Sequence, residues 1–233
     1  MVDSTRICDR ERAVPLAVDV VPAPNVLYWG GPNLYVNLTS RCSSACTFCL
    51  AGFTDDLYGY DLRLTSQQEP EAAELASAFE EASGAGIPEE VVFTGLGEPT
   101  LRLDVLLGAV RWLTARRLPT RLDTNGHAAL LHPGRDVVRE LVDAGLRAVS
   151  VSLNAHDETT YDLLCRPRFS RAYPAVQQFI RESVGAGLDV TATVVDVPEV
   201  DLVAAAAVAA DLGATFRVRR LLSPGATRPE GPS

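Results

Sequence analysis

The chain contains no lysine, since all 21 of its basic residues are arginine. This absence excludes a Walker A phosphate loop, a pyridoxal phosphate Schiff base and any lysine general base, because each of them depends on a lysine amine. Long apolar runs are also missing. The longest is the alanine-rich segment 202–210, which is too short to span a bilayer. We therefore expect no transmembrane segment and no membrane partner.

Cysteine is scarce, with five residues in total, and three of them fall within 42–49. An odd number with this clustering does not suit a secreted disulfide framework. The first residues, MVDSTRICDRER, also lack the apolar centre of a secretory signal peptide. We expect a cytoplasmic protein.

Acidic residues exceed basic ones by 30 to 21, and the net charge is −9. Such a balance repels a phosphate backbone and an anionic lipid surface unless a local basic patch overrides it. The charge therefore argues against a nucleic-acid partner.

The 233 residues, 47% hydrophobic and 22% charged, are enough for one domain with a sizeable core. Short β-branched runs alternate with longer segments of helical period, which predicts a parallel α/β sheet. Six such strand–helix units form either a doubly wound sheet or an incomplete (β/α) barrel. The expected strands are 33–39, 90–95, 120–124, 148–153, 189–196 and 215–220.

Predicted helices lie near 101–116, 134–145, 158–164, 171–184 and 200–212. A further helix should follow the capping-box pattern of Ser66 and Glu69 and stop before Gly84. Prolines interrupt the first segment, and the last segment is rich in Pro, Gly and Ser. We divide the chain into an extended arm (1–27), a barrel domain (28–222) and a flexible tail (223–233).

The segment TSRCSSACTFCLAG follows the first predicted strand and carries Cys42, Cys46 and Cys49. With three and then two residues between them, one loop can aim three thiolates at a common centre. A 4Fe–4S cluster held by three cysteines keeps one iron open, as a substrate-binding cluster requires.

Other uses of these cysteines are disfavoured. Structural zinc needs a fourth ligand, and neither Cys8 nor Cys165 repeats a paired zinc-site spacing. A ferredoxin-type carrier normally has a fourth cysteine close by, and none follows Cys49. We interpret Cys8 and Cys165 as isolated thiols.

The spacing CxxxCxxC, with Phe48 immediately before its third cysteine, resembles that of the radical S-adenosylmethionine (SAM) superfamily. The segment FTGLGEPT after the second strand supports the resemblance, because Gly97 and Glu98 match a GGEP-type motif. This implies that Glu98 holds the amino group of the SAM methionine, a charge-assisted contact. The implied fold is a partial (β/α)6 TIM-type barrel.

The resemblance extends to SVSLNAHD, whose Ser152 and Asn154 would bond the ribose hydroxyls of SAM. Both lie on one face of a strand because side chains alternate. Asn125, which follows the third predicted strand, joins the cofactor-binding set. The cluster and Asn125 should therefore meet Glu98 at the carboxyl ends of parallel strands, where such barrels build their sites.

Longer stretches such as SLNAHDETTYDLLCRP resemble the TatD-associated radical SAM proteins. The resemblance implies an enzyme that cleaves SAM reductively to a 5'-deoxyadenosyl radical, which takes hydrogen from an unknown substrate. It further implies a one-electron donor such as flavodoxin or ferredoxin, and a TatD-type hydrolase on a separate polypeptide. The alternative is a non-catalytic partner module of such a hydrolase, stabilised by a metal cluster.

Substrate contacts are expected from the loop after the cysteines and from arginines near the barrel mouth. Tyr60 and Asp61 are either substrate contacts or a packing tyrosine with a capping aspartate. Pro167 should break the helix at Arg166, which is then a carboxylate anchor for SAM or substrate, or a silent surface residue. The remaining candidates for substrate contact are Tyr58, Asn125, Arg217 and Arg219.

Overall fold

The computed structural model describes residues 25–57 and 59–221. Within them, seven strands form one sheet in the order β1-β2-β5-β6-β7-β8-β9, and β3 pairs with β4 in a small separate hairpin. The strands are β1 (Leu27–Gly30), β2 (Asn33–Asn37), β3 (Asp56–Leu57), β4 (Tyr60–Asp61), β5 (Val91–Thr94), β6 (Thr120–Thr124), β7 (Ala148–Ser152), β8 (Asp189–Val195) and β9 (Thr215–Arg219).

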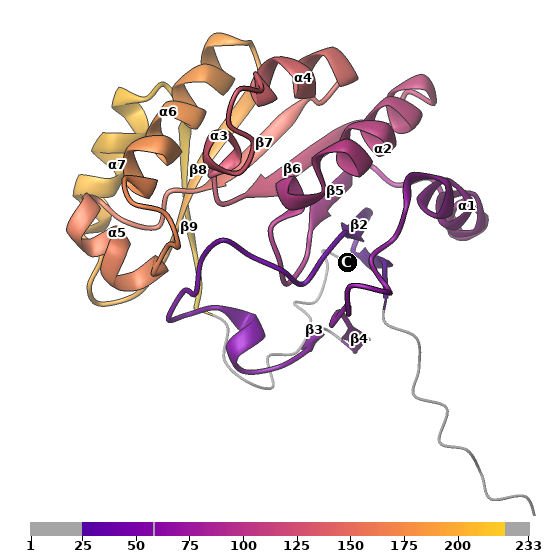
Figure 1. Cartoon of the computed structure of the whole chain (residues 1–233), viewed down its shortest axis with the longest axis horizontal. Helices are drawn as coiled ribbons and strands as arrows, with labels where there is room; N and C mark the ends of the chain where they lie inside the picture. The colour runs from indigo at the N-terminus through magenta and orange to yellow at the C-terminus, as the bar shows by residue number, and fades with distance from the viewer. Residues whose placement is uncertain (1–24, 58, 222–233) are drawn as a thin grey trace, which may run out of the picture.

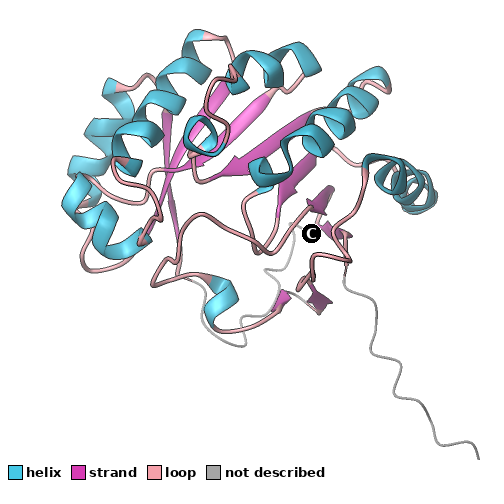
Figure 2. Cartoon of the chain, in the orientation of Figure 1, coloured by secondary structure: helices cyan, strands magenta, loops and turns pink. Residues whose placement is uncertain are grey.

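The α-helices cover the outer, convex side of the curved sheet (Figures 1 and 2). None of the helices in the described ranges is long and apolar enough to cross a membrane. The helices are α1 (Ala72–Ala82), α2 (Leu103–Ala115), α3 (Ala128–Leu131), α4 (Val137–Ala144), α5 (Glu158–Cys165), α6 (Ala172–Gly185) and α7 (Leu202–Asp211), with 3-10 turns η1 (Leu50–Gly52), η2 (Ser83–Ala85) and η3 (Pro99–Arg102).

Within the main sheet, each strand from β2 to β9 pairs in parallel with the next strand of that sheet along the chain. This unbroken order is that of an open barrel, because a doubly wound sheet reverses its strand order in the middle. The six predicted strands are all present, and their observed ends differ from the predicted ones by at most two residues. The parallel α/β fold is confirmed.

The edge strand β1 was not predicted. It pairs antiparallel with β2, and the rings of Tyr28 and Tyr35 stack at a centroid distance of 5.3 Å across this pair. The prolines before it hid the strand, although a short tyrosine- and tryptophan-containing run suits a sheet. Most of the expected N-terminal arm (1–24) and the expected tail (223–233) lie outside the described residues.

Side chains alternate along each strand between an apolar set that faces the helices and a more polar set that faces the concave side of the sheet. Side chains such as Val36 and Leu122 face the helices and are fully buried in the main core. Their strand neighbours face the concave side of the sheet, where polar and charged groups collect, among them Tyr35, Arg121 and Asp123. The apolar half of each strand therefore forms the core, and the other half lines the open barrel.

The capping-box prediction for Ser66 and Glu69 is wrong. Helix α1 starts at Ala72, and the reciprocal capping bonds are made between Glu71 and Glu74. Both pairs have a suitable three-residue spacing, so the local pattern alone could not choose between them.

Glu69 instead joins the start of the cysteine loop to α1 and η3. Its carboxylate accepts hydrogen bonds from Thr39, from Arg41 at 2.8 and 2.7 Å, and from Arg102 at 3.0 Å. Burial by itself raises the pKa of Glu69, but these hydrogen bonds outweigh it and lower the pKa to about 2. The ionised carboxylate thus stabilises the folded chain.

We expect Glu69→Gln to lower the free energy of unfolding by about 1–2 kcal/mol at pH 7, an effect moderated by the exposure of Arg41 to water. Because the folded-state pKa is lowered, this stabilisation is present above the unfolded-state pKa of about 4.3 and is lost as pH falls toward 2. Urea unfolding at pH 7 and at pH 3 tests this, and the difference between parent and variant should shrink at pH 3. Glu81→Gln, on the exposed side of α1, is the control and should change neither value.

Candidate active site

The cysteine loop, residues 38–49, leaves the end of β2 and crosses the mouth of the open barrel toward α5 (Figure 1). Cys42 is exposed on it, whereas Cys46 and Cys49 are partly buried. Desolvation, and next the charge of Glu98, raise the pKa of the Cys42 thiol to about 12. Since iron binds the thiolate, metal binding at these cysteines must release protons.

Backbone hydrogen bonds tie the loop to the end of α5. Thr47 N–H donates to the Leu164 carbonyl at 2.8 Å, and Arg168 N–H donates to the Ser43 carbonyl at 3.0 Å. Between these contacts α5 ends, and Arg166 takes a left-handed conformation with φ +44°. The predicted helix break before Pro167 is therefore present, and it brings Arg166 to the cysteine loop.

Cys165 is not the isolated thiol that we expected. It is buried at the last position of α5, its carbonyl accepts a hydrogen bond from Ala45 N–H at 3.1 Å, and its thiol raises the pKa of the neighbouring Cys46 thiol. The Nδ2 amide of Asn154 also donates to Cys165 Sγ at 3.6 Å. Sequence separation concealed this neighbour, because only the docking of the loop onto α5 brings the two cysteines together.

The turn before Glu98 packs directly on the cysteine loop. Glu98 N–H donates to the Arg41 carbonyl at 2.8 Å. A Cβ atom on Gly97 would lie 2.4 Å from the carbonyl oxygens of both Thr39 and Arg41. Glycine at this position is thus required by the close approach of two backbone segments.

The carboxylate of Glu98 is buried and accepts four hydrogen bonds. Oε1 accepts from Thr100 N–H and Oγ1 at 3.1 and 2.6 Å and from Thr124 Oγ1 at 2.7 Å, while Oε2 accepts from Asn125 N–H at 2.7 Å. Burial nevertheless raises the pKa of Glu98 above its ordinary value. Oε2, with one donor, keeps capacity for a second.

Asn125 links Glu98 to the cysteine loop. Its Nδ2 donates to Ser43 Oγ at 2.9 Å and points at Cys42 Sγ at 3.7 Å. The Ser43 hydroxyl shares a 2.9 Å hydrogen bond with Nδ1 of His127, whose Nε2 lies 2.8 Å from the Tyr161 hydroxyl. Burial lowers the pKa of His127 to about 4, so this histidine is neutral at pH 7.

The sequence singles out none of Ser43, His127 and Tyr161 as a site residue. All three are buried. Two of them stand beside motifs that the sequence shows: Ser43 follows the first cysteine of the CxxxCxxC spacing, and His127 follows TNG. Their contacts join residues 84 and 34 positions apart in the chain, so only the fold reveals them.

Ser152 and Asn154 lie at the carboxyl end of β7. The Ser152 hydroxyl accepts a hydrogen bond from Arg219 at 3.4 Å. Asn154 is buried with φ +57°, a left-handed conformation that asparagine tolerates better than most residues. Its Oδ1 atom is buried and has no hydrogen-bond partner among the described residues. This orphaned acceptor lies beside Cys165 and is available to a ligand.

Phe48 is half-buried and packs against the main core. This packing anchors the end of the loop that carries Cys49. In the hairpin that follows, Tyr60 packs on Tyr28 with a ring-centroid distance of 5.4 Å, and Asp61 Oδ1 accepts from Arg63 N–H at 3.0 Å. These contacts match the packing-and-capping interpretation of Tyr60 and Asp61. Tyr58 lies outside the described residues.

The donor set suits an iron–sulfur cluster better than a single ion. In the described ranges, no three Cys, His, Asp or Glu side chains are placed to hold one metal ion. A cubic cluster poses a different requirement, because each cysteine binds its own iron atom and the thiols stay apart. Cys42, Cys46 and Cys49 share one loop and lie close enough to influence one another's pKa, so they are the candidates for such ligands.

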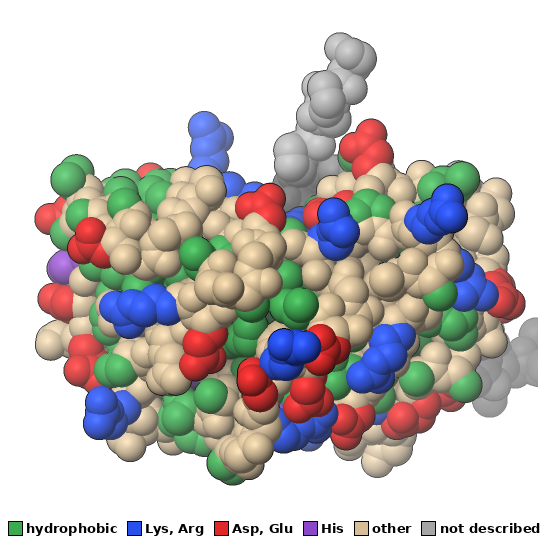
Figure 3. Space-filling view, turned by 90° about the horizontal axis from the view of Figure 1, so that it is seen from above, with side chains coloured by type: hydrophobic (Ala, Val, Ile, Leu, Met, Phe, Trp, Pro, Cys, Tyr) green, Lys and Arg blue, Asp and Glu red, His purple; other side chains and the backbone are tan. Residues whose placement is uncertain are grey.

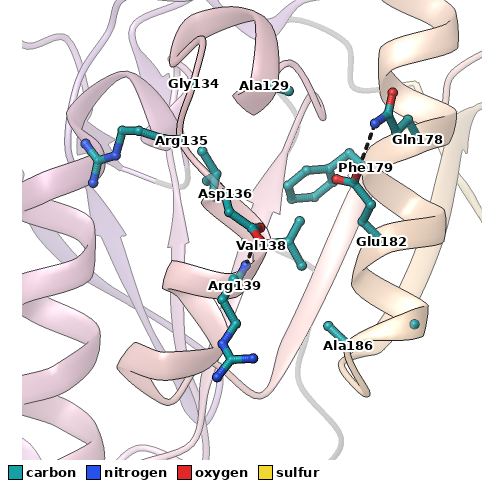
Figure 4. Close-up of a pocket in the computed structure, with 12 residues that line it drawn as sticks. Ala129, Gly134, Arg135, Asp136, Val138, Arg139, Gln178, Phe179, Glu182 and Ala186 are labelled. Atoms are coloured by element: carbon teal, nitrogen blue, oxygen red, sulfur yellow. Dashed lines mark hydrogen bonds between the residues drawn. The ribbon is translucent and has the colours of Figure 1, made fainter.

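A groove of about 620 Å³ lies elsewhere, on the helical side between the start of α4 and α6 (Figure 4). The side chains that line it include Arg139, which forms an ion pair with Asp143, and Gln178, which bonds Glu182. None of the site residues predicted from the sequence lines this groove. The chemistry of the cysteine loop is therefore separate from it.

The fold and the site together define a class of protein, an open parallel (β/α) barrel with a three-cysteine loop after its first parallel strand. Residues 36–204 match the Radical SAM superfamily, and the chain belongs to this superfamily. Members of the superfamily use a 4Fe–4S cluster and S-adenosylmethionine.

Among curated relatives, GTP 3',8-cyclase of Staphylococcus aureus (strain Mu3 / ATCC 700698) is 30% identical over 169 residues, which is 70% of this chain and 45% of the relative. GTP 3',8-cyclase of Rhizobium etli (strain CIAT 652) is 32% identical over 168 residues, 70% of this chain and 44% of the relative. The chain thus spans less than half the length of these curated relatives.

Solved structures share the fold. SuiB of Streptococcus suis bound to S-adenosylmethionine matches 88% of this chain and 44% of that chain, with a TM-score of 0.64 and 15% identity. TYW1 with a lysine-pyruvate adduct bound matches 84% of this chain and 67% of that chain, with a TM-score of 0.58 and 12% identity. The barrel architecture is therefore that of known radical SAM structures.

Gly97→Ala should destabilise the folded chain by about 2 kcal/mol or more, because its Cβ would displace the backbone of the cysteine loop. Gly84→Ala is the matched control, since a Cβ at Gly84 meets nothing within 4 Å. Thermal and urea unfolding of both variants test the contact. Equal stability of the two variants would contradict the packing of the turn against the loop.

Proposed function

We propose that this chain carries the SAM-cleaving centre of a radical SAM enzyme. The contact between Asn125 and Cys42 supports this most strongly. Asn125 also binds the Glu98 carboxylate, so it joins the cysteine loop to the turn formed by residues 97–99, the GEP turn. A 4Fe–4S cluster bound here would supply the electron that cleaves SAM to a 5'-deoxyadenosyl radical, which abstracts hydrogen from a substrate. Which substrate this is does not follow from the contacts of the site.

Cys42, Cys46 and Cys49 are the proposed cluster ligands. The hydrogen bonds from the loop to α5 and to the GEP turn restrain the thiols before any cluster assembles. The loop itself crosses the open mouth of the barrel, so a cluster bound to it would lie at the carboxyl ends of the strands (Figure 1).

Glu98 is proposed to hold the SAM methionine ammonium through Oε2, which has one donor and room for another. Gly97 brings the carboxylate to the loop, as its lack of a side chain allows. Such a charge-assisted hydrogen bond fixes the amino acid part of SAM next to the cysteines.

Asn154 and Ser152 are proposed to bind the ribose. The support is the orphaned Oδ1 of Asn154, since a buried acceptor without a partner is costly unless a ligand donates to it. Phe48 is proposed to support the loop beneath the cofactor, and Arg166, at the end of α5, to bind the carboxylate of SAM.

Partners are proposed on the superfamily's chemistry. Radical SAM enzymes generally need a one-electron donor, and we propose flavodoxin or ferredoxin for this chain. A TatD-type hydrolase on a separate polypeptide and a cytoplasmic location are proposed from the sequence resemblance. Affinity purification with a purified TatD-type hydrolase tests the partnership, and the absence of any complex would reject it.

The proposed activity is tested by anaerobic reconstitution with iron and sulfide, followed by reduction in the presence of SAM. We expect 5'-deoxyadenosine to form. A protein that binds the cluster but yields no 5'-deoxyadenosine would instead be the non-catalytic module of a hydrolase.

Replacement of Cys42, Cys46 or Cys49 by alanine should abolish cluster binding, which is measured as iron, sulfide and visible absorbance. Cys165→Ala is the matched control, because it removes a buried thiol beside Cys46 that is not part of the CxxxCxxC loop. It should retain about four iron atoms per chain, as expected for one cubic cluster. Loss of the cluster in Cys165→Ala would make Cys165 a ligand and revise the triad.

Glu98→Gln should keep the cluster and weaken SAM binding about tenfold or more, because a charged hydrogen bond to an ammonium is worth roughly 1.5–3 kcal/mol. Glutamine is chosen because alanine would strand the buried donors of Thr100 and Thr124. Calorimetric titration of the reconstituted variant with SAM measures the effect. An unchanged SAM affinity would remove Glu98 from the proposed site.

A further inference from the structure

The concave side of the sheet carries positive charge in a chain that is acidic as a whole. Arg121 on β6 and Arg217 and Arg219 on β9 share this side, against the carboxylates of Asp123 and Glu90. The view of the molecule from above in Figure 3 shows a different distribution, with acidic and basic side chains interspersed. The excess of arginine on the concave side is therefore local.

Arg121 is occupied. Its guanidinium contacts Glu90 at 2.9 Å and also pairs with Asp123, so its charge is matched by two carboxylates. Asp123 lies near Arg217 and Arg219 as well, and their charges partly offset the rise that burial causes in its pKa.

Arg217 and Arg219 themselves are largely without partners. Within the described ranges, neither lies within salt-bridge distance of a carboxylate, and each donates one hydrogen bond to a neutral serine. The distances are 3.2 Å from Arg217 to Ser150 and 3.4 Å from Arg219 to Ser152. Because a guanidinium has five N–H donors in a planar fork, most donors of both exposed side chains have no protein partner among the described residues and are open to a ligand.

Arg219 reaches the proposed reaction centre. It donates a hydrogen bond at 3.4 Å to Ser152, one of the two proposed ribose contacts. Arg217 lies two residues before it, on the same face of β9. An anion held by Arg217 and Arg219 would therefore lie on the concave side, close to where SAM is proposed to bind.

We propose that Arg217 and Arg219, with Ser150 and Ser152, form a binding site for the anionic group of the substrate. The inference rests on the proposed function and adds to it the chemical class of the substrate, a small molecule that carries phosphate or paired carboxylate groups. Two arginines at positions i and i+2 on one strand face are separated by about 7 Å along the strand. This separation suits a ligand with two adjacent anionic groups, each gripped by one planar fork.

The test uses the full reconstituted chain and two probes, pyrophosphate and malonate, in calorimetric titrations at low salt. The parent protein should bind at least one of them. The double variant Arg217→Met, Arg219→Met should bind that probe about tenfold more weakly or worse, because it loses charge-assisted hydrogen bonds. The matched control is Arg111→Met, Arg181→Met, which removes the same charge from exposed positions on α2 and α6 and should leave binding unchanged.

Three results would overturn the proposal. The parent chain could bind neither probe, or the control could weaken binding as much as the concave pair does. In the third, the Arg217→Met, Arg219→Met variant would retain probe binding but lose affinity for SAM, which would assign the arginines to the cofactor carboxylate. Decarboxylated SAM checks this third result: because it lacks the carboxylate, the parent and the variant should then bind it equally.

A second variant pair keeps the test decisive where the methionine variant does not fold. Arg217→Lys with Arg219→Lys retains both charges but not the forks, and should bind the probe about threefold more weakly or worse. An affinity equal to that of the parent would reject the site. Failure of the proposed function is measured separately, because probe binding requires neither the cluster nor 5'-deoxyadenosine formation.

Discussion

Backbone hydrogen bonds hold the cysteine loop at two places, the end of α5 and the turn before Glu98. The second contact is so close that Gly97 has no room for a Cβ atom. Since these are main-chain contacts, the position of the three thiols follows from the path of the backbone rather than from side-chain choices. The positions of Asn125, Glu98 and Cys165 relative to the thiols all depend on this docking.

The site is built largely from buried polar groups that bind one another. Glu98 is surrounded by donors from Thr100, Thr124 and Asn125, and Ser43 continues the chain of contacts to His127. Buried polar networks of this kind restrict side chains to one arrangement, because breaking any member strands another. The capacity that is left over, at Glu98 Oε2 and Asn154 Oδ1, is the capacity that a bound cofactor would use.

Prediction from sequence succeeded where a local pattern had a single physical meaning. The six parallel strands follow from β-branched runs, and the helix break at Arg166 follows from the steric effect of Pro167 on its neighbour. It failed where a local pattern had two solutions or none. Glu69 fitted a capping box as well as Glu71 did, and β1 is short and follows a proline-rich segment, so only its pairing with β2 marks it as a strand.

The amino-acid sequence by itself determined the parallel α/β class, the cysteine loop and the family, because these depend on periodicity and on fixed spacings within short segments. Only the tertiary structure decided that Cys165 lies beside Cys46, that His127 binds Ser43 and that Arg217 and Arg219 bond serines of β7. Each of these contacts joins segments separated by dozens of residues. Their geometry is decided by how the strands pair and by how the loop packs across the barrel, which no local pattern records.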